Sequence, residues 1–110
     1  MTSYAQDSFT VDEDSSNPLT AAFRLHGDLD YVSAEDLLAV VIARLGRAPA
    51  PLEIHLDCAG LGICDSTGLS ALIVIRRRAA AMGVRLHLDN RGAALDRLLD
   101  ITGTREHLVA

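Results

Sequence analysis

Residues 64–69, Cys-Asp-Ser-Thr-Gly-Leu, place an acid, two hydroxyls and a glycine between two apolar segments. The segment before them alternates like a strand, and the segment after them carries apolar residues at helical spacing. A hydroxyl at such a strand-to-helix corner could cap the helix, attack an ester or accept a phosphate. Each of these uses makes different demands on the rest of the chain.

The neighbouring residues disfavour catalysis at this corner. The Gly-x-Ser-x-Gly elbow of serine hydrolases requires glycine two residues before Ser66, where this chain has Cys64. A phosphate-binding loop is also disfavoured, because Gly60-Leu61-Gly62 is followed by no Gly-Lys-Ser/Thr and the chain contains no lysine. We therefore expect no catalytic residue, no cofactor and no enzymatic activity.

A cap and a functional hydroxyl are the remaining interpretations of the corner. An aspartate, serine or threonine at a helix N-terminus accepts a hydrogen bond from the first turn and contributes about 1 kcal/mol. We expect one of Asp65, Ser66 and Thr67 to do this. Capping does not require all three polar residues together, so the spacing fits both a simple cap and an exposed functional hydroxyl.

Composition limits the class of protein. The 110 residues suffice for one domain, the formal net charge is −5, and all ten basic residues are arginine. An acidic chain lacks the basic face that the phosphates of nucleic acids attract, so we expect no direct nucleic-acid binding. The N-terminal residues lack the pattern of a signal peptide, and the apolar runs are too short to cross a membrane. These features predict a cytoplasmic protein without a membrane interaction.

The cysteines and histidines show no ligand spacing in the sequence. Cys58 and Cys64 do not form a Cys-x-x-Cys pair, so we expect free thiols. The four histidines are scattered along the chain: His26, His55, His87 and His107. The sequence therefore predicts no metal site.

The elements that position the corner follow from periodicity and from turn residues. Residues 1–7 are expected to be flexible, and residues 8–110 to form the domain. The expected strands cover residues 8–13, 19–26, 52–57 and 84–89, and the expected helices cover 33–45, 66–82 and 93–101. Residues 59–64 are interpreted as a short link into the corner.

Alternation in the strands indicates which face of the sheet is covered. Polar residues recur at every second position in three strands: Arg24 and His26; Glu53, His55 and Asp57; Arg85, His87 and Asp89. A sheet covered on both faces would have nearly continuous apolar strands. We predict a single α/β domain with a mixed, mostly parallel sheet, helices on one face and the order β-β-α-β-α-β-α.

Three blocks of the chain resemble one known family. Asp65-Ser66-Thr67-Gly68-Leu69, preceded by Ile54-His55-Leu56-Asp57, is similar to the signature of the STAS-domain anti-sigma factor antagonists of bacteria, also called anti-anti-sigma factors. Arg24-Leu25-His26-Gly27-Asp28-Leu29-Asp30 with Ser33-Ala34-Glu35, and Leu95-Asp96-Arg97-Leu98-Leu99-Asp100-Ile101-Thr102-Gly103, resemble two further family segments. The resemblance spans residues 19–108 and implies a STAS-like fold, which agrees with the α/β domain predicted above.

The resemblance implies a phosphorylation switch. Ser66 would be phosphorylated by an anti-sigma factor that is also a serine kinase of the GHKL ATPase type, and a phosphoserine phosphatase would reverse the modification. The unphosphorylated protein would bind this kinase and release a sigma factor. Thr67 stands where many members have a second serine, so a second acceptor remains open.

The resemblance also implies a partner-binding surface, with Ser33 capping the adjacent helix. Its residues would be Asp28, Asp30, Ser33, Asp65, Ser66, Thr67, Gly68 and Leu69. An alternative for the same fold is a STAS interaction or scaffold subunit of a signalling or lipid-transport complex, without a phosphorylation switch.

Overall fold

A computed structural model describes residues 9–14 and 16–108 of the chain. Its elements follow in the order β1 (Phe9–Asp14), β2 (Thr20–Leu29), α2 (Ala34–Leu45), β3 (Glu53–Cys64), α3 (Ser66–Ala81), β4 (Arg85–Asp89), α4 (Ala93–Thr102) and α5 (Arg105–Leu108). The predicted order is confirmed, with the one-turn helix α5 added after it. The segment 1–7 and Ser8 lie outside the described residues.

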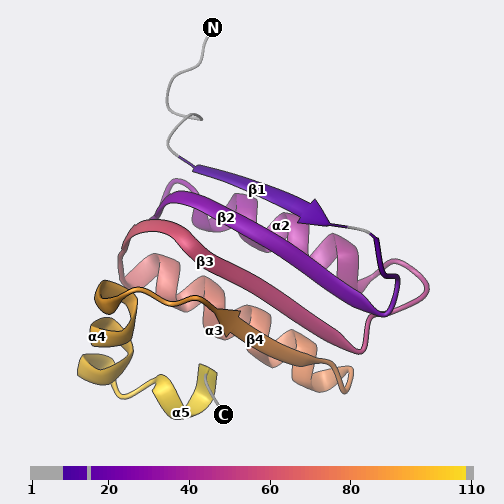
Figure 1. The fold of residues 1–110 in the computed structure, drawn as a ribbon. Coiled ribbons are helices and arrows are strands. Elements are labelled where there is room, and N and C mark those ends of the chain that lie inside the picture. Colours follow the sequence, from indigo (N-terminus) through magenta and orange to yellow (C-terminus); the bar gives the residue numbers. More distant parts are fainter. Residues whose placement is uncertain (1–8, 15, 109–110) are drawn as a thin grey trace, which may run out of the picture.

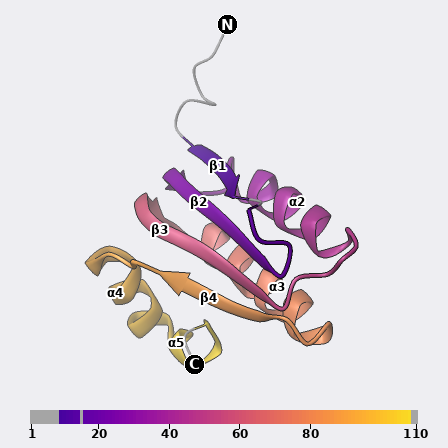
Figure 2. The same cartoon turned by 45° about the vertical axis from the view of Figure 1, so that its right-hand side comes forward.

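The four strands form one sheet in the order β1-β2-β3-β4 (Figure 1). Strand β1 runs antiparallel to β2, whereas β2, β3 and β4 are parallel to one another. Helices α2 and α3 connect the parallel strands and lie on the same side of the sheet in both views (Figure 1, Figure 2). The predicted mixed sheet with helices on one face is therefore confirmed.

Alternate side chains of the strands divide between a core and a polar face. Phe23, Ile54 and Leu56 are buried under the helices, together with Leu37 and Leu72 from α2 and α3. The intervening residues line up across the parallel strands in three rows: Thr20-Glu53-Arg85, Ala22-His55-His87 and Arg24-Asp57-Asp89. We call these rows the polar face.

Strands β2 and β3 continue further than their alternation predicts. Residues 59–64, interpreted from the sequence as a link, belong to β3, which pairs with β2 through two register shifts. Glycines permit this close pairing, because a Cβ at Gly60 would lie 2.6 Å from the Leu25 carbonyl oxygen and one at Gly62 would collide with Asp28 Oδ1. Glycines that resemble turn signals in the sequence therefore mark irregular strand pairing.

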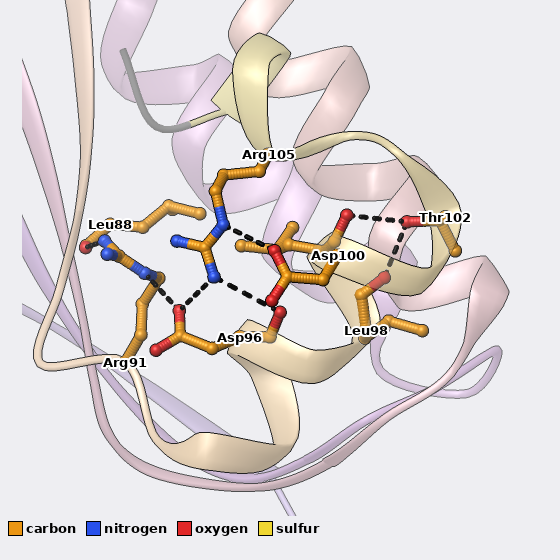
Figure 3. Close-up of polar contacts among 8 residues, drawn as sticks. Leu88, Arg91, Asp96, Leu98, Asp100, Thr102 and Arg105 are labelled. Atoms are coloured by element: carbon orange, nitrogen blue, oxygen red, sulfur yellow. Dashed lines mark hydrogen bonds and ion pairs between the residues drawn. The ribbon is translucent and has the colours of Figure 1, made fainter.

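The C-terminal helices close the β4 edge of the core through Leu95, Leu99 and Leu108. Figure 3 shows the polar contacts that hold this region together. Arg91 Nε donates to Asp96 Oδ1 at 2.8 Å, and Arg105 Nε donates to Asp100 Oδ1 at 2.7 Å. The hydrogen bond from Arg105 lowers the pKa of the Asp100 carboxyl. These arginines and aspartates pair with one another and with backbone groups, so their role is to hold the C-terminal helices in place.

Candidate functional site

The predicted partner-binding residues meet at one end of the sheet, where β2 and β3 lead into α2 and α3. We call residues 28–33 and 63–69 the tip. Two hydrogen bonds join its halves: Asp65 N donates to the Leu29 carbonyl oxygen at 3.1 Å, and Ile63 N donates to the side-chain Oδ1 of Asp28 at 2.8 Å. The structure thus brings together two segments that lie more than thirty residues apart in the sequence.

Asp65 is the residue that caps α3. Its backbone is extended, with φ −95° and ψ −175°, and its Oδ1 accepts a hydrogen bond from Gly68 N at 2.8 Å. Leu69 N then donates to the Asp65 carbonyl oxygen at 2.9 Å. The prediction that one of three residues caps the helix is confirmed, and the cap is the acid rather than a hydroxyl.

Capping by Asp65 leaves both neighbouring hydroxyls available to a partner. Ser66 and Thr67 are exposed in the first turn of α3, and neither side-chain oxygen is hydrogen-bonded within the part of the chain that the structure describes. The positive end of the helix dipole and the free N–H groups of a first turn favour a negative group at such a position. The geometry is therefore suited to carry a phosphate.

Gly68 and Leu69 support this turn from beneath. Both are buried, and Leu69 belongs to the hydrophobic core. A Cβ at Gly68 would collide with the carbonyl oxygen of Leu29 and lie 2.9 Å from its Cγ. Glycine is thus required for α3 to start directly against the end of β2, and both residues position Ser66 from within.

The first half of the tip is organised by two carboxylates. Asp28 Oδ1 accepts from Ile63 N, and Asp30 Oδ1 accepts from Val32 N at 3.0 Å and from Ser33 N at 3.2 Å. Each carboxylate therefore fixes backbone within the tip.

The Ser33 side chain does not cap α2, and the expectation that it would is wrong. Its backbone is already helical, with φ −93° and ψ −16°, and its side chain bonds to no helix N–H group. A helical turn already begins before Ser33, because Ala34 N donates to the Asp30 carbonyl oxygen at 2.8 Å. The buried Ser33 hydroxyl instead accepts from Asp30 N at 3.0 Å and donates to the Asp28 carbonyl oxygen at 2.7 Å.

Three exposed apolar residues of the tip were not identified from the sequence. Tyr31 is 74% exposed, Ile63 is 68% exposed and Val32 is 58% exposed. The signal was present in Asp30-Tyr31-Val32-Ser33, where a large apolar pair follows a strand and precedes a helix. Exposed aromatic and aliphatic side chains of this kind form the centres of protein interfaces.

The cysteine within the tip, Cys64, is not a competing nucleophile. Burial, assisted by the charge of Asp65, raises the pKa of the Cys64 thiol to about 11. Burial likewise raises the pKa of Cys58 to about 12. Both free thiols are therefore protonated near neutral pH, and the thiolate is the reactive form.

Comparison with known proteins identifies the family. A family model described as "Mlab, STAS domain" matches residues 14–110 of the chain. The chain belongs to the STAS-domain family. The family predicted from the three sequence blocks is thereby confirmed at the level of the STAS domain. No curated protein matches this chain.

Solved structures of STAS proteins share the fold at low sequence identity. An anti-sigma factor antagonist from Mycobacterium paratuberculosis is 22% identical, with a TM-score of 0.77 over 96% of this chain and 86% of that one. The phosphorylated Bacillus cell fate determinant SpoIIAA is 20% identical, with a TM-score of 0.71 over 91% of this chain and 89% of that one. A sulfate transporter family protein from Wolinella succinogenes is 21% identical, with a TM-score of 0.71 over 81% of this chain and 70% of that one.

The fold thus occurs in both regulatory and transport proteins. In the described part of this chain, every helix is too short or too polar to cross a bilayer.

Proposed function

We propose that this protein is an anti-sigma factor antagonist whose partner binding is switched by phosphorylation of Ser66. Unphosphorylated, it binds an anti-sigma factor that is a serine kinase of the GHKL ATPase type, and a sigma factor is released. Phosphorylation ends this binding, and a phosphoserine phosphatase restores it. In this scheme the protein acts in the cytoplasm as the substrate of another enzyme and catalyses no reaction itself.

The bond from Gly68 N to Asp65 Oδ1 is the observation that carries this proposal. Because the aspartate caps α3, the first turn needs no hydroxyl for its stability. Ser66 is nevertheless polar, exposed and placed directly after the cap. A hydroxyl in this position that the helix does not need for its cap supports a role as phosphoacceptor.

The surface around Ser66 supports partner binding in the unmodified state. Tyr31, Val32 and Ile63 offer apolar area, while the carboxylates of Asp28 and Asp30 are occupied by backbone N–H groups. A partner that covers the tip would bury mainly apolar groups and a neutral hydroxyl. The tip would therefore be the binding surface of the kinase, with Asp65, Ser66 and Thr67 at its edge.

Phosphorylation is expected to affect binding much more than folding. The added charge of about −1.5 to −2 meets the N-terminus of α3, which tolerates it. In the complex the same phosphate would lie beside Asp65 and lose its hydration. A loss of about 4 kcal/mol, or a thousandfold in affinity, is within the range of one misplaced buried charge.

Binding measurements with the cognate kinase test the switch. Ser66→Ala should bind the kinase like the unmodified protein and resist phosphorylation, whereas Ser66→Asp and the phosphorylated protein should bind much more weakly in calorimetry. Thr67→Ala is the matched control and should remain switchable. Equal affinity of the phosphorylated and unphosphorylated forms would exclude the proposed function.

A STAS subunit of a larger transport or signalling assembly is the second candidate. The structural match to a sulfate transporter family protein favours it. Affinity purification from the native cell distinguishes the two functions. A stable complex with membrane transport subunits that persists with Ser66→Asp would support the assembly role, and a phosphorylation-sensitive complex with a kinase would support the switch.

A further inference from the structure

We propose that Glu53, His55 and His87 on the polar face form a binding site for a divalent metal ion of the zinc class. His55 and His87 are register partners on β3 and β4, and Glu53 lies two residues before His55 on the same face of β3. One candidate ligand atom from each side chain falls within 4.8 Å of the other two. Two imidazoles and one carboxylate are a common set of protein ligands for zinc.

The distances suit a single shared ion. Glu53 Oε1 lies 2.8 Å from His87 Nε2 and 3.4 Å from His55 Nε2. Zinc bonds to nitrogen and oxygen of about 2.0–2.2 Å place neighbouring ligands of a tetrahedral ion roughly 3.3–3.5 Å apart. Side-chain rotations that turn the ring planes toward each other would bring the three atoms onto one face of a metal coordination sphere.

Both imidazole rings present Nε2 to the same carboxylate oxygen, Glu53 Oε1, and would turn about their Cβ–Cγ bonds to bring their in-plane lone pairs onto one ion. They stack with their centroids 4.4 Å apart and an angle of 11° between their planes. Asp89 Oδ2 lies 2.8 Å from His55 Nδ1, and an ionised carboxylate can only accept, so Nδ1 carries the proton. In the neutral ring the lone pair of Nε2 then faces Glu53, as in the carboxylate–histidine–metal arrangements of zinc proteins.

The arrangement leaves polar atoms that a cation would satisfy. His87 Nε2 is shielded from solvent and makes no properly oriented hydrogen bond within the described residues, despite its short distance to Glu53 Oε1. His55 Nε2 lies 3.4 Å from the same oxygen, Glu53 Oε1. A metal ion among the three atoms would bond to all of them at once.

The surroundings add negative charge and leave an open side. A cavity of about 380 Å³ adjoins His55, and its charged lining residues are four acids and one arginine: Asp12, Asp14, Asp57, Asp89 and Arg24. Arg85 Nη2 approaches the other carboxylate oxygen of Glu53 at 3.9 Å, but its side chain is 77% exposed and is free to move away. Water would complete the coordination from the open side.

Metal binding to the tag-free full chain, stripped of metal with a chelator, tests this site. We expect one Zn²⁺ per chain by calorimetry, and visible absorption bands of a tetrahedral ion with Co²⁺. Glu53→Gln, His55→Gln and His87→Gln should each weaken binding at least tenfold while circular dichroism shows an intact fold. His26→Gln, which removes an exposed histidine outside the cluster, should bind like the unmodified protein.

Two outcomes would overturn the proposal. One is that the unmodified protein takes up no Zn²⁺ or Co²⁺ saturably, which would mean that protons alone satisfy the two histidines. The other is that His55→Gln and His87→Gln bind the ions as tightly as His26→Gln.

Discussion

Acidic residues have different partners in two regions of the molecule. At the tip, the carboxylates accept hydrogen bonds from backbone N–H groups, as at Asp28, Asp30 and Asp65. On the polar face, Glu53 and Asp89 instead contact imidazole rings of neighbouring strands. Backbone donors are present whatever the conditions, so the carboxylates of the tip maintain one shape. Imidazoles change with protonation and with bound ions. The tip is thus a rigid platform that presents a hydroxyl, and the polar face is a set of side chains that can respond to its surroundings.

The rigidity of the tip depends most on Gly68, and Gly68→Ala should give the largest change in stability. Its new Cβ would collide with the Leu29 carbonyl oxygen, a backbone atom that cannot move without displacing β2. We expect the free energy of unfolding in urea to fall by about 2–3 kcal/mol. In the control Gly46→Ala the nearest atom, the Ile42 carbonyl oxygen, lies 3.6 Å away, so the change should stay within about 0.5 kcal/mol. Equal effects would contradict the close approach.

The cap of α3 should have a smaller effect. Asp65→Ala removes the acceptor of the Gly68 N–H group and should lower the free energy of unfolding by about 1 kcal/mol. Asp65→Asn keeps an acceptor oxygen and should retain most of this stability. If the alanine and asparagine variants unfold at the same urea concentration, Asp65 does not act as the cap.

We expect Asp57 on the polar face to make the stability of the protein depend on pH. Hydrogen bonds from the Ala59 N–H group and then from Asn90 lower the pKa of Asp57 below its ordinary value of 3.8. The stability that Asp57 contributes is therefore present above pH 3.8 and is lost as the pH falls through its lowered pKa. Asp57→Asn should reduce the melting temperature at neutral pH and approach the unmodified protein in acid.

Asn90→Gly should alter the same pH dependence to a smaller extent, because it leaves the Asp57 carboxylate in place. It removes one of the two donors to Asp57 and tolerates the positive φ of 57° at this position. We expect a weaker pH dependence than in the unmodified protein when melting temperatures are compared in acid and at neutral pH. An unchanged pH profile in both variants would show that these hydrogen bonds do not persist in solution.

The smallest change in stability is expected for Ser66, the residue that we propose as the phosphoacceptor. The Ser66 side chain is exposed and has no hydrogen-bond partner in the described structure, so Ser66→Ala should shift the free energy of unfolding by less than about 0.5 kcal/mol. A loss of more than 1 kcal/mol in urea would assign Ser66 a structural role and weaken the contrast with Asp65.

Local patterns in the sequence predicted the elements well where one rule applied. The alternation of Glu53, His55 and Asp57 identified both the strand and its polar side, and the acid before Ser66 marked a helix start. The extension of β3 was missed because Gly60 and Gly62 resemble turn residues when the neighbouring strand is unknown. Ser33 was misassigned because the chain begins to coil at Asp30.

Contacts between distant segments required the structure. His55 and His87 are neighbours only because β3 and β4 are parallel and in this register. Leu29 and Cys64 are likewise neighbours only because β2 and β3 are parallel and end together. Sequence spacing within one segment cannot reveal either arrangement.

The most direct test of the central claim is to map the phosphate after incubation of the full chain with its cognate kinase and ATP. Mass spectrometry should find one phosphate on Ser66 both in the protein of natural sequence and in Thr67→Ala. It should find none at the tip of Ser66→Ala. Phosphate found only on other residues, with Ser66 unmodified, would contradict the assignment of Ser66 as the switch.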